Sequence, residues 1–236
     1  MRAHRVRALL MGGQACVFYG AAEFSRDTDL VIVADSVNLG RLRKALAELR
    51  AEVIAVPPFE VKHLRRGHAV HFRCQHPDAL RMRVDVMSKM RGVDAFPALW
   101  KRRTTLALPD GTVCDLLSLP DLVQAKKTQR DKDWPMIRRL VEAHYFQHRA
   151  QPNPAQIRFW LKELRTPSLL TETAQLHPTQ CKRCQGIRPL LSHALAGNTV
   201  ELEKALQAEE SGERERDRLH WLPLKVELEK LRHGKA

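Results

Sequence analysis

A strand that opens with two acids constrains the fold more than any other feature of the chain. Residues 27–35 read DTDLVIVAD, and the β-branched side chains that follow Asp29 predict a buried β-strand. Successive side chains of a strand leave opposite faces, so Asp27 and Asp29 share one face, about 6.6 Å apart along the backbone. The segment therefore predicts a sheet whose buried strand begins at an acidic face.

The segment in front of this strand predicts a strand, a turn and a helix. Residues 6–11 (VRALLM) are short and apolar and are followed at once by Gly12 and Gly13, and residues 14–22 (QACVFYGAA) predict a short apolar helix. The basic start MRAHRVR before an apolar run also resembles a secretory signal. Gly12, Gly13 and Gln14 interrupt that run, which argues against a signal.

The following residues predict that strands and helices alternate. Ser36 is a candidate cap for a helix to about residue 50, with leucines recurring at helical spacing. Residues 52–56 (EVIAV) predict a strand, and HAVHFRC and RMRVDVM predict a hairpin that turns at Pro77 and Asp78. We therefore expect an α/β (α+β) fold with a short mixed sheet flanked by helices.

The second strand of that hairpin carries a third acid. In RMRVDVM, Met82, Val84 and Val86 share one face, whereas Asp85 lies on the other with Arg83 and Met87. A buried acid without a partner is costly, so we expect Asp85 to meet the Asp27/Asp29 face on a neighbouring strand. Asp115 in TVCDLL is the alternative third acid and ranks lower, because its surroundings are typical of a strand end.

Two helices and then a proline-rich segment mark the expected end of the first domain. Ser118 and Pro120 introduce the helical pattern DLVQAKKTQR, and a second helix is expected near Pro135. Beyond QPNPAQ the patterns IRFWLKELR, VELEKALQAEE and LKVELEKLR predict helices. We expect one domain over residues 1–149 and a helical domain over 150–236.

Charge and cysteine content limit the class of protein. Forty Lys and Arg against 27 Asp and Glu give a formal net charge of +13, which favours phosphate-rich partners, although a solvated basic surface explains it equally well. No apolar run is long enough to span a bilayer. Five cysteines, an odd number without a disulfide pattern, favour a reducing cytoplasm.

The three acids and the glycine pair together predict phosphate chemistry. Magnesium prefers oxygen ligands and keeps part of its coordination sphere for water and substrate phosphates, which suits Asp27, Asp29 and Asp85 on one face. Gly12 and Gly13 precede a helix, where free backbone N–H groups suit a triphosphate.

This combination resembles the nucleotidyltransferase fold of the polymerase β superfamily, whose pattern is a Gly-Gly or Gly-Ser pair, a spacer, and then Asp-h-Asp-h, with h apolar. The segment SLPDLVQAKKTQRDKDWPMIRRL resembles an element of the small bacterial nucleotidyltransferases related to the AbiEii toxins. The resemblance covers about residues 5 to 145. Thr28 stands where the family has an apolar residue, and Gly12-Gly13 lacks the serine that many members carry.

The resemblance implies transfer of a nucleoside monophosphate from an NTP, such as ATP, to an acceptor, with release of pyrophosphate. It implies that Asp27 and Asp29 bind two Mg²⁺, that Asp85 completes the second metal site, and that Lys126 or Lys127 neutralises the phosphates. Arg130 and Lys132 are weaker candidates. The basic charge favours RNA, including tRNA, as the acceptor, while a protein side chain, a small molecule such as an aminoglycoside, and a toxin role stay open.

Two other interpretations accompany this one. A chain that kept the fold but lost the chemistry would be a non-catalytic module that binds nucleic acid or a partner. In HPTQCKRC, His177, Cys181 and Cys184, with His193 as a fourth ligand, have spacing that would suit zinc, but a second cysteine pair is missing and two ordinary thiols are the simpler interpretation.

Overall fold

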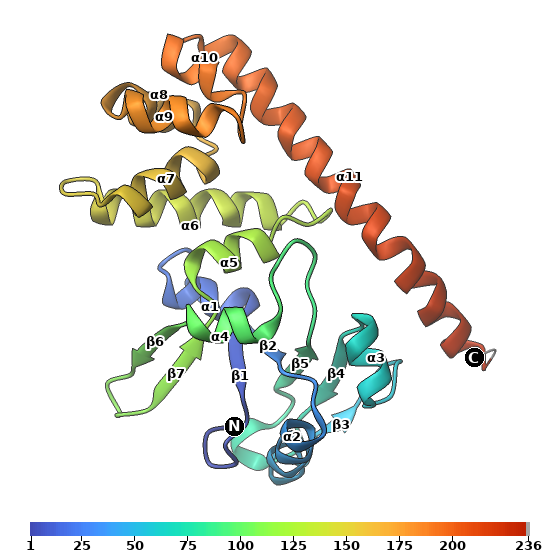
Figure 1. The fold of residues 1–236 in the computed structure, drawn as a ribbon. Helices are drawn as coiled ribbons and strands as arrows, with labels where there is room; N and C mark the ends of the chain where they lie inside the picture. The colour runs from blue at the N-terminus through green and yellow to red at the C-terminus, as the bar shows by residue number, and fades with distance from the viewer. Residues whose placement is uncertain (235–236) are drawn as a thin grey trace. The chain divides into compact units, whose positions relative to one another are not determined.

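The computed structural model describes residues 1–234, which form two compact units (Figure 1). The first unit contains Met1–Ala125 together with the segment from Leu219 onward, and the second contains Lys126–Arg218. This grouping does not establish which segments fold alone, so the expected domains 1–149 and 150–236 stay a prediction.

The first unit is built on a seven-stranded sheet with the strand order β3-β4-β5-β2-β1-β7-β6. Its strands are β1 (Ala8–Met11), β2 (Asp27–Ile32), β3 (Glu52–Val53), β4 (Val70–Arg73), β5 (Arg83–Met87), β6 (Thr104–Ala107) and β7 (Val113–Leu116). The pairs β2–β5 and β1–β7 are parallel and the other neighbours are antiparallel. The structure confirms the expected mixed α/β class and the mixed sheet.

Helices connect these strands (Figure 1). They are α1 (Gly12–Phe18), α2 (Ser36–Glu48), α3 (Val61–Arg66), α4 (Phe96–Lys101) and α5 (Leu119–Ala125). The expected cap of α2 was wrong by one residue: the Asp35 side chain accepts a 2.7 Å hydrogen bond from the Asn38 backbone N–H, and Ser36 is the first helical residue. A carboxylate at this position also interacts favourably with the helix dipole.

The predicted hairpin is present, with its turn in a short 3-10 helix, Pro77–Ala79. Strand β4 pairs antiparallel with β5. Along β5, Val84 and Val86 are buried, whereas Arg83, Asp85 and Met87 are partly exposed. This alternation confirms the assignment of Asp85 to the face opposite the two valines, so the apolar core lies behind the acidic residues.

The second unit is helical. It contains α6 (Asp133–His148), α7 (Pro154–Glu163), α8 (Pro167–Leu176), α9 (Pro178–Gln185), α10 (Leu191–Ala196) and the part of α11 (Thr199–Arg232) up to Arg218. Three of these helices begin with a proline, where the missing backbone N–H has no helical partner to lose. The core of the unit includes Trp160, Leu161 and Leu191.

The last two helical patterns of the sequence belong to one 34-residue helix, α11, that continues through Pro223. Both patterns are helical as predicted, and they belong to the same helix. A proline inside a helix removes one backbone hydrogen bond, and the apolar spacing on both sides of Pro223 stays in phase with a single helix.

No helix within residues 1–234 is both long enough and apolar enough to cross a membrane.

Candidate active site

Strands β2 and β5 are neighbours in the sheet (Figure 1) and carry the three predicted acids. In the parallel pairing of these strands, Asp29 stands directly opposite Asp85. Asp27 precedes Asp29 by two positions and therefore shares its face. The register thus brings together the strand positions of the three acids predicted from the sequence.

The glycine pair brings the start of α1 against this face. Met11, the last residue of β1, pairs with Asp29, and Gly12 follows with a φ of +66°. A Cβ added to Gly12 would lie only 1.8 Å from Oδ2 of Asp29, so no larger residue fits beside the carboxylate. Gly13 is similarly confined, because its Cβ would lie 2.4 Å from Oγ of Ser25. Both glycines therefore allow close packing beside the acids.

The Asp85 carboxylate is held by two neighbours. Nε of Arg83 donates a 2.9 Å hydrogen bond to Oδ1 of Asp85, and Nδ1 of His71, opposite Asp85 on β4, lies 2.9 Å from the same oxygen. Burial raises the pKa of Asp85, but the hydrogen bonds from His71 and Arg83 outweigh it and hold the pKa below its usual range. Asp85 is therefore an ionised carboxylate at neutral pH.

Arg83 interacts with all three acids. Its hydrogen bond to Asp85 raises the pKa of the guanidinium, and the negative charges of Asp27 and Asp29 act in the same direction. Its Nη2 also lies 3.2 Å from Nδ1 of His71. Nδ1 of His71 donates to Asp85 when it carries a hydrogen, and it accepts from Arg83 when it does not. Arg83 is thus a cation of the acidic face.

His71 and Arg83 were not among the predicted site residues, although the sequence carries a signal for both. Arg83 was placed on the same face as Asp85 by the alternation of the strand. His71 lies in the other strand of the predicted hairpin, and its register with Asp85 would have followed from a correct alignment of the two strands.

The three carboxylates were compared with the requirements of a magnesium site. Their oxygens are the hard ligands that Mg²⁺ prefers, and the strand register places them on one face. Within residues 1–234, however, no group of three or more His, Cys, Asp or Glu side chains is arranged to hold a metal ion. The three acids are of the residue type that Mg²⁺ prefers, but their side chains are not arranged as a metal site, and Asp85 bonds Arg83; the two Mg²⁺ stay a prediction.

The two lysines predicted to bind phosphate already have carboxylate partners. Nζ of Lys126 lies 3.3 Å from Oδ1 of Asp133, and Nζ of Lys127 lies 2.8 Å from Oε2 of Glu163. Both lysines are buried and belong to the second unit. Their role at a phosphate stays a prediction, and the observed pairs show a structural use for both charges.

The alternative third acid, Asp115, has a structural environment. It receives hydrogen bonds of 2.9 Å from Nε of Arg103 and 2.7 Å from Oγ1 of Thr105. Strand β7 is separated from β2 by β1, so Asp115 does not stand opposite Asp27 or Asp29. This order favours Asp85 over Asp115 as the third acid.

The cysteines considered for zinc are buried thiols. Cys181 and Cys184 lie on α9, and Sγ of Cys181 is 3.7 Å from the carbonyl oxygen of Leu191. Burial is the main cause that raises the pKa of Cys181, and the neighbouring Cys184 adds to it. A raised pKa disfavours the thiolate that would bind a metal, so the structure gives the zinc interpretation no support.

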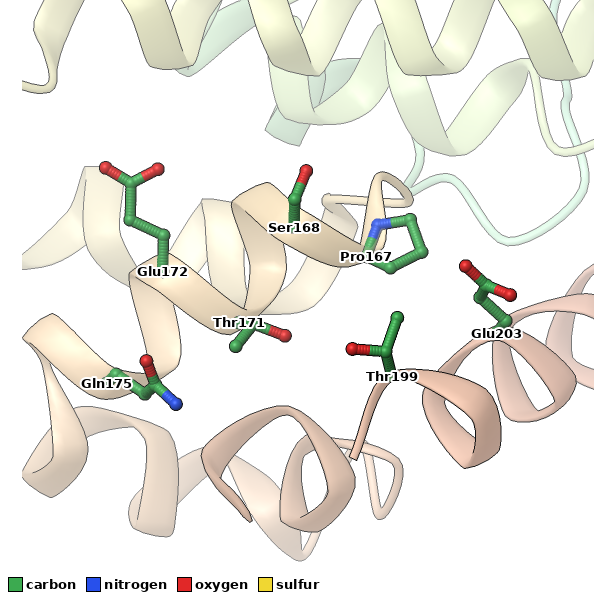
Figure 2. Close-up of a pocket in the computed structure, with 7 residues that line it drawn as sticks. All are labelled: Pro167, Ser168, Thr171, Glu172, Gln175, Thr199 and Glu203. Atoms are coloured by element: carbon green, nitrogen blue, oxygen red, sulfur yellow. The ribbon is translucent and has the colours of Figure 1, made fainter. Parts of the chain in front are cut away.

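A pocket of about 500 Å³ lies within the second unit and contains none of the predicted site residues (Figure 2). Helix α8 and the beginning of α11 supply its lining, which is Pro167, Ser168, Thr171, Glu172, Gln175, Thr199 and Glu203. This lining offers hydroxyl groups and two carboxylates but no lysine or arginine. Such a surface repels a triphosphate, so the pocket is not a candidate NTP site.

No protein-family model matches the chain, and no curated protein matches it in sequence. The functional assignment therefore depends on the residues of the acidic face and their geometry.

Proposed function

We propose that the chain is an Mg²⁺-dependent nucleotidyltransferase that transfers a nucleoside monophosphate from an NTP to an acceptor. One observation supports this proposal above all others: Asp29 stands opposite Asp85 on adjacent strands, with Asp27 on the same face. The close approach of Gly12 to Asp29 adds to it, because the backbone at the start of α1 then lies beside the carboxylates.

In this proposal Asp27, Asp29 and Asp85 are the metal ligands. Mg²⁺ held by these residues would offset the charge of the triphosphate and would polarise the acceptor hydroxyl. The acceptor oxygen attacks the α-phosphorus, the bond to the β-phosphate oxygen breaks, and pyrophosphate leaves. Asp85, an ionised carboxylate at neutral pH, accepts the proton of the acceptor hydroxyl.

The acceptor is proposed to be RNA, including tRNA, because the formal net charge of +13 favours a polyanion. A protein side chain and a small molecule are the other acceptor classes, and an acceptor assay separates the three.

The competing proposal is a non-catalytic module that keeps the fold and binds nucleic acid or a partner protein. The bond from Arg83 to Asp85 favours it, because an arginine that permanently neutralises the third acid would leave no complete metal site.

One experiment separates the two. The protein is incubated with Mg²⁺ and each α-labelled NTP, with and without bulk RNA, and label in RNA, in protein and in small molecules is counted. We expect Asp29→Asn to lower transfer at least about a hundredfold, since a ligand that stabilises transition-state charge is lost. Asp78→Asn is the matched control, because that carboxylate is 92% exposed on the hairpin turn.

Unchanged RNA binding by both variants, with no label in any product of the wild-type protein, supports the non-catalytic module and rules out the transferase.

A further inference from the structure

Arginines gather around one aromatic ring and one carboxylate of the first unit. Nη2 of Arg2 lies 3.4 Å from Oδ2 of Asp115, and Nε of Arg103 donates a 2.9 Å hydrogen bond to Oδ1 of the same residue. The guanidinium carbons of Arg103 and Arg7 lie 4.2 and 5.2 Å from the centroid of the Trp100 ring. Together with two further arginines they form a surface that we call the N-terminal basic patch. Its members are Arg2, Arg5, Arg7, Arg41 and Arg103.

The backbone beneath this patch is held in place. The side chain of the buried Asn38 accepts a 2.7 Å hydrogen bond from the Arg7 backbone N–H and donates a 3.1 Å hydrogen bond to the Arg7 carbonyl oxygen. Nη1 of Arg41 donates a 3.2 Å hydrogen bond to the carbonyl oxygen of Arg5. Arg5 and Arg7 are themselves exposed. The fold therefore fixes the points at which these two side chains leave the backbone.

The N-terminal basic patch carries more positive charge than its acid offsets. Asp115 supplies all the ion pairs that the five arginines make within residues 1–234, and it pairs with Arg2 and Arg103. An excess of like charge on one surface creates a positive potential that attracts a polyanion. The Trp100 ring adds order, because a guanidinium placed over an indole is attracted by it. Excess charge on ordered side chains distinguishes this patch from arginines that are only solvated.

We propose that the N-terminal basic patch binds the phosphate backbone of a nucleic acid. The planar guanidinium, with its five N–H donors, matches the geometry of phosphate oxygens. The Trp100 ring is already contacted by two guanidiniums and by Phe96, whose ring centroid lies 5.7 Å away, so it orders the arginines and is not free to stack on a base. The contacts are therefore made to phosphates, and binding does not depend on base sequence.

The patch lies away from the acidic face. Arg7 directly precedes β1, whereas Met11 ends this strand and pairs with Asp29. The four residue steps from Arg7 to Met11 span about 13 Å of extended chain. Nucleic acid on the patch is thus held beside the acids and not on them. The inference does not depend on metal binding or on transfer, since a transferase and a non-catalytic module would both use such a surface.

The test measures binding of fluorescently labelled oligouridylate and oligothymidylate by anisotropy over a range of salt concentrations. The double variant Arg5→Gln, Arg7→Gln should bind about tenfold or more weakly at low salt. Its slope of log affinity against log salt should be shallower by about 1.4, because each phosphate contact on a single strand contributes about 0.7. Arg7→Lys keeps the charge and should leave the slope unchanged.

The matched control is the double variant Arg73→Gln, Arg81→Gln. It removes the same charge from two exposed arginines beside β4 and β5, which β2 separates from β1. Arg81 has a φ of +64° and Arg5 a φ of +52°, so both double variants alter one residue with a left-handed backbone. The control should bind within about twofold of the wild-type protein, because charges remote from the bound strand are screened by salt. Urea unfolding should give wild-type midpoints for both double variants.

The unmodified protein provides a measurement that does not depend on whether the variants fold. Its slope of log affinity against log salt should be at least about 2 in magnitude, since the patch offers five cations. A slope near zero overturns the inference. Loss of binding to both oligonucleotides in the Arg5 and Arg7 variant supports a backbone reader of either nucleic acid, and loss for oligouridylate alone identifies RNA as the partner.

Two further outcomes overturn the inference. The first is equal affinity and equal slope in the two double variants. The second is patch-dependent binding to vesicles of phosphatidylcholine and phosphatidylserine without binding to either oligonucleotide, which would show that the patch binds a membrane surface. Label transfer that requires Asp29, together with equal RNA affinity in both double variants, overturns the patch and leaves the transferase. Patch-dependent RNA binding without any label transfer does the reverse.

Discussion

The two units use charged side chains in opposite ways. In the second unit, Nη2 of Arg188 lies 2.8 Å from Oε2 of Glu209, and Nη1 donates to the carbonyl oxygens of Leu161 and Leu164 at 2.9 and 3.0 Å. Arg165 contacts the same Glu209 oxygen at 3.3 Å. Two of these hydrogen bonds end on backbone carbonyls and the others on a carboxylate of α11, so the cluster stabilises the packing of the unit.

In the first unit, Arg83 bonds Asp85 and is attracted by Asp27 and Asp29, and its side chain is partly exposed. The Asp85 carboxylate contacts the side chains of Arg83 and His71, both from strands of the same sheet. The two clusters therefore differ in how firmly their arginines are enclosed: Arg188 is buried, whereas Arg83 is partly exposed.

The largest expected effect tests the structural side of this comparison. Arg188→Met should lower the free energy of unfolding by about 3–5 kcal/mol, because it leaves Glu209 and two carbonyl oxygens with fewer partners. Lys204→Ala, which breaks an exposed pair with Glu201, should cost less than about 0.5 kcal/mol. Urea unfolding measures both. Similar small losses for the two variants would show that the buried cluster does not hold the unit together.

A smaller effect is expected at the acidic face. Gly12→Ala should cost about 2–3 kcal/mol, since it strains a backbone with a φ of +66° and displaces the Asp29 carboxylate, and it should also abolish label transfer. Gly20→Ala has the same kind of strain at a φ of +74°, but a new Cβ meets nothing within 4 Å, so only about 1 kcal/mol and no activity should be lost. Thermal unfolding and the transfer assay give the two readouts. Equal losses in both variants would mean that Asp29 is not confined by Gly12.

The smallest expected effect is a difference in acid sensitivity between the units. Burial, aided by the neighbouring His148, lowers the pKa of His144 to about 4, and Nε1 of Trp160 donates a 2.9 Å hydrogen bond to its Nδ1. In the unfolded chain a histidine has a pKa of about 6.5, so on acidification the unfolded state takes up the proton before the folded state does. The stabilisation is therefore complete above pH 6.5 and is lost as the pH falls toward 4. For Asp85 the folded pKa is lowered instead, and its contribution is lost only below the unfolded value of 3.8.

We therefore expect the free energy of unfolding of the second unit to fall by on the order of 1–2 kcal/mol between pH 6.5 and about 4. This figure is reduced for the partial exposure of His144. The acidic face should be affected only at lower pH. Amide hydrogen exchange resolved by unit measures this difference. His144→Gln should remove the loss of stability in that range. A first unit that loosens earlier would contradict the expected order.

Local patterns predicted the parts of the site that depend on one or two strands. The alternation in RMRVDVM placed Asp85 on the correct face, and the two-residue spacing of Asp27 and Asp29 placed them together. The partners of Asp85 were not predicted, because the contact between His71 and Asp85 depends on the register of a hairpin with a nine-residue connection. Long charged side chains such as Arg83 can also reach several acids, and only their packing decides among them.

The sequence also did not predict the partners of two lysines, because these contacts depend on packing. Lys126 pairs with Asp133, and Lys127 pairs with Glu163. A lysine beside an acid in the sequence is typical of a solvated surface. Whether such a lysine is buried depends on helices that follow it in the sequence and pack against it. By contrast, the start of α7 could have been read locally, since Asn153 and Gln156 form a capping box around Pro154.

The first unit is assembled from two segments that are far apart in the chain. Glu227 in α11 bonds both Arg66 and His68, with Nε of Arg66 at 2.8 Å from Oε1, across 161 residues of sequence. The buried Leu224 lies beside Gly67, whose Cβ would be 3.8 Å from its Cδ1. Closing so long a loop adds little to the equilibrium cost but delays the contact. During synthesis the strands of the acidic face therefore leave the ribosome long before the residues that complete their unit, so the order of translation and the order of assembly differ.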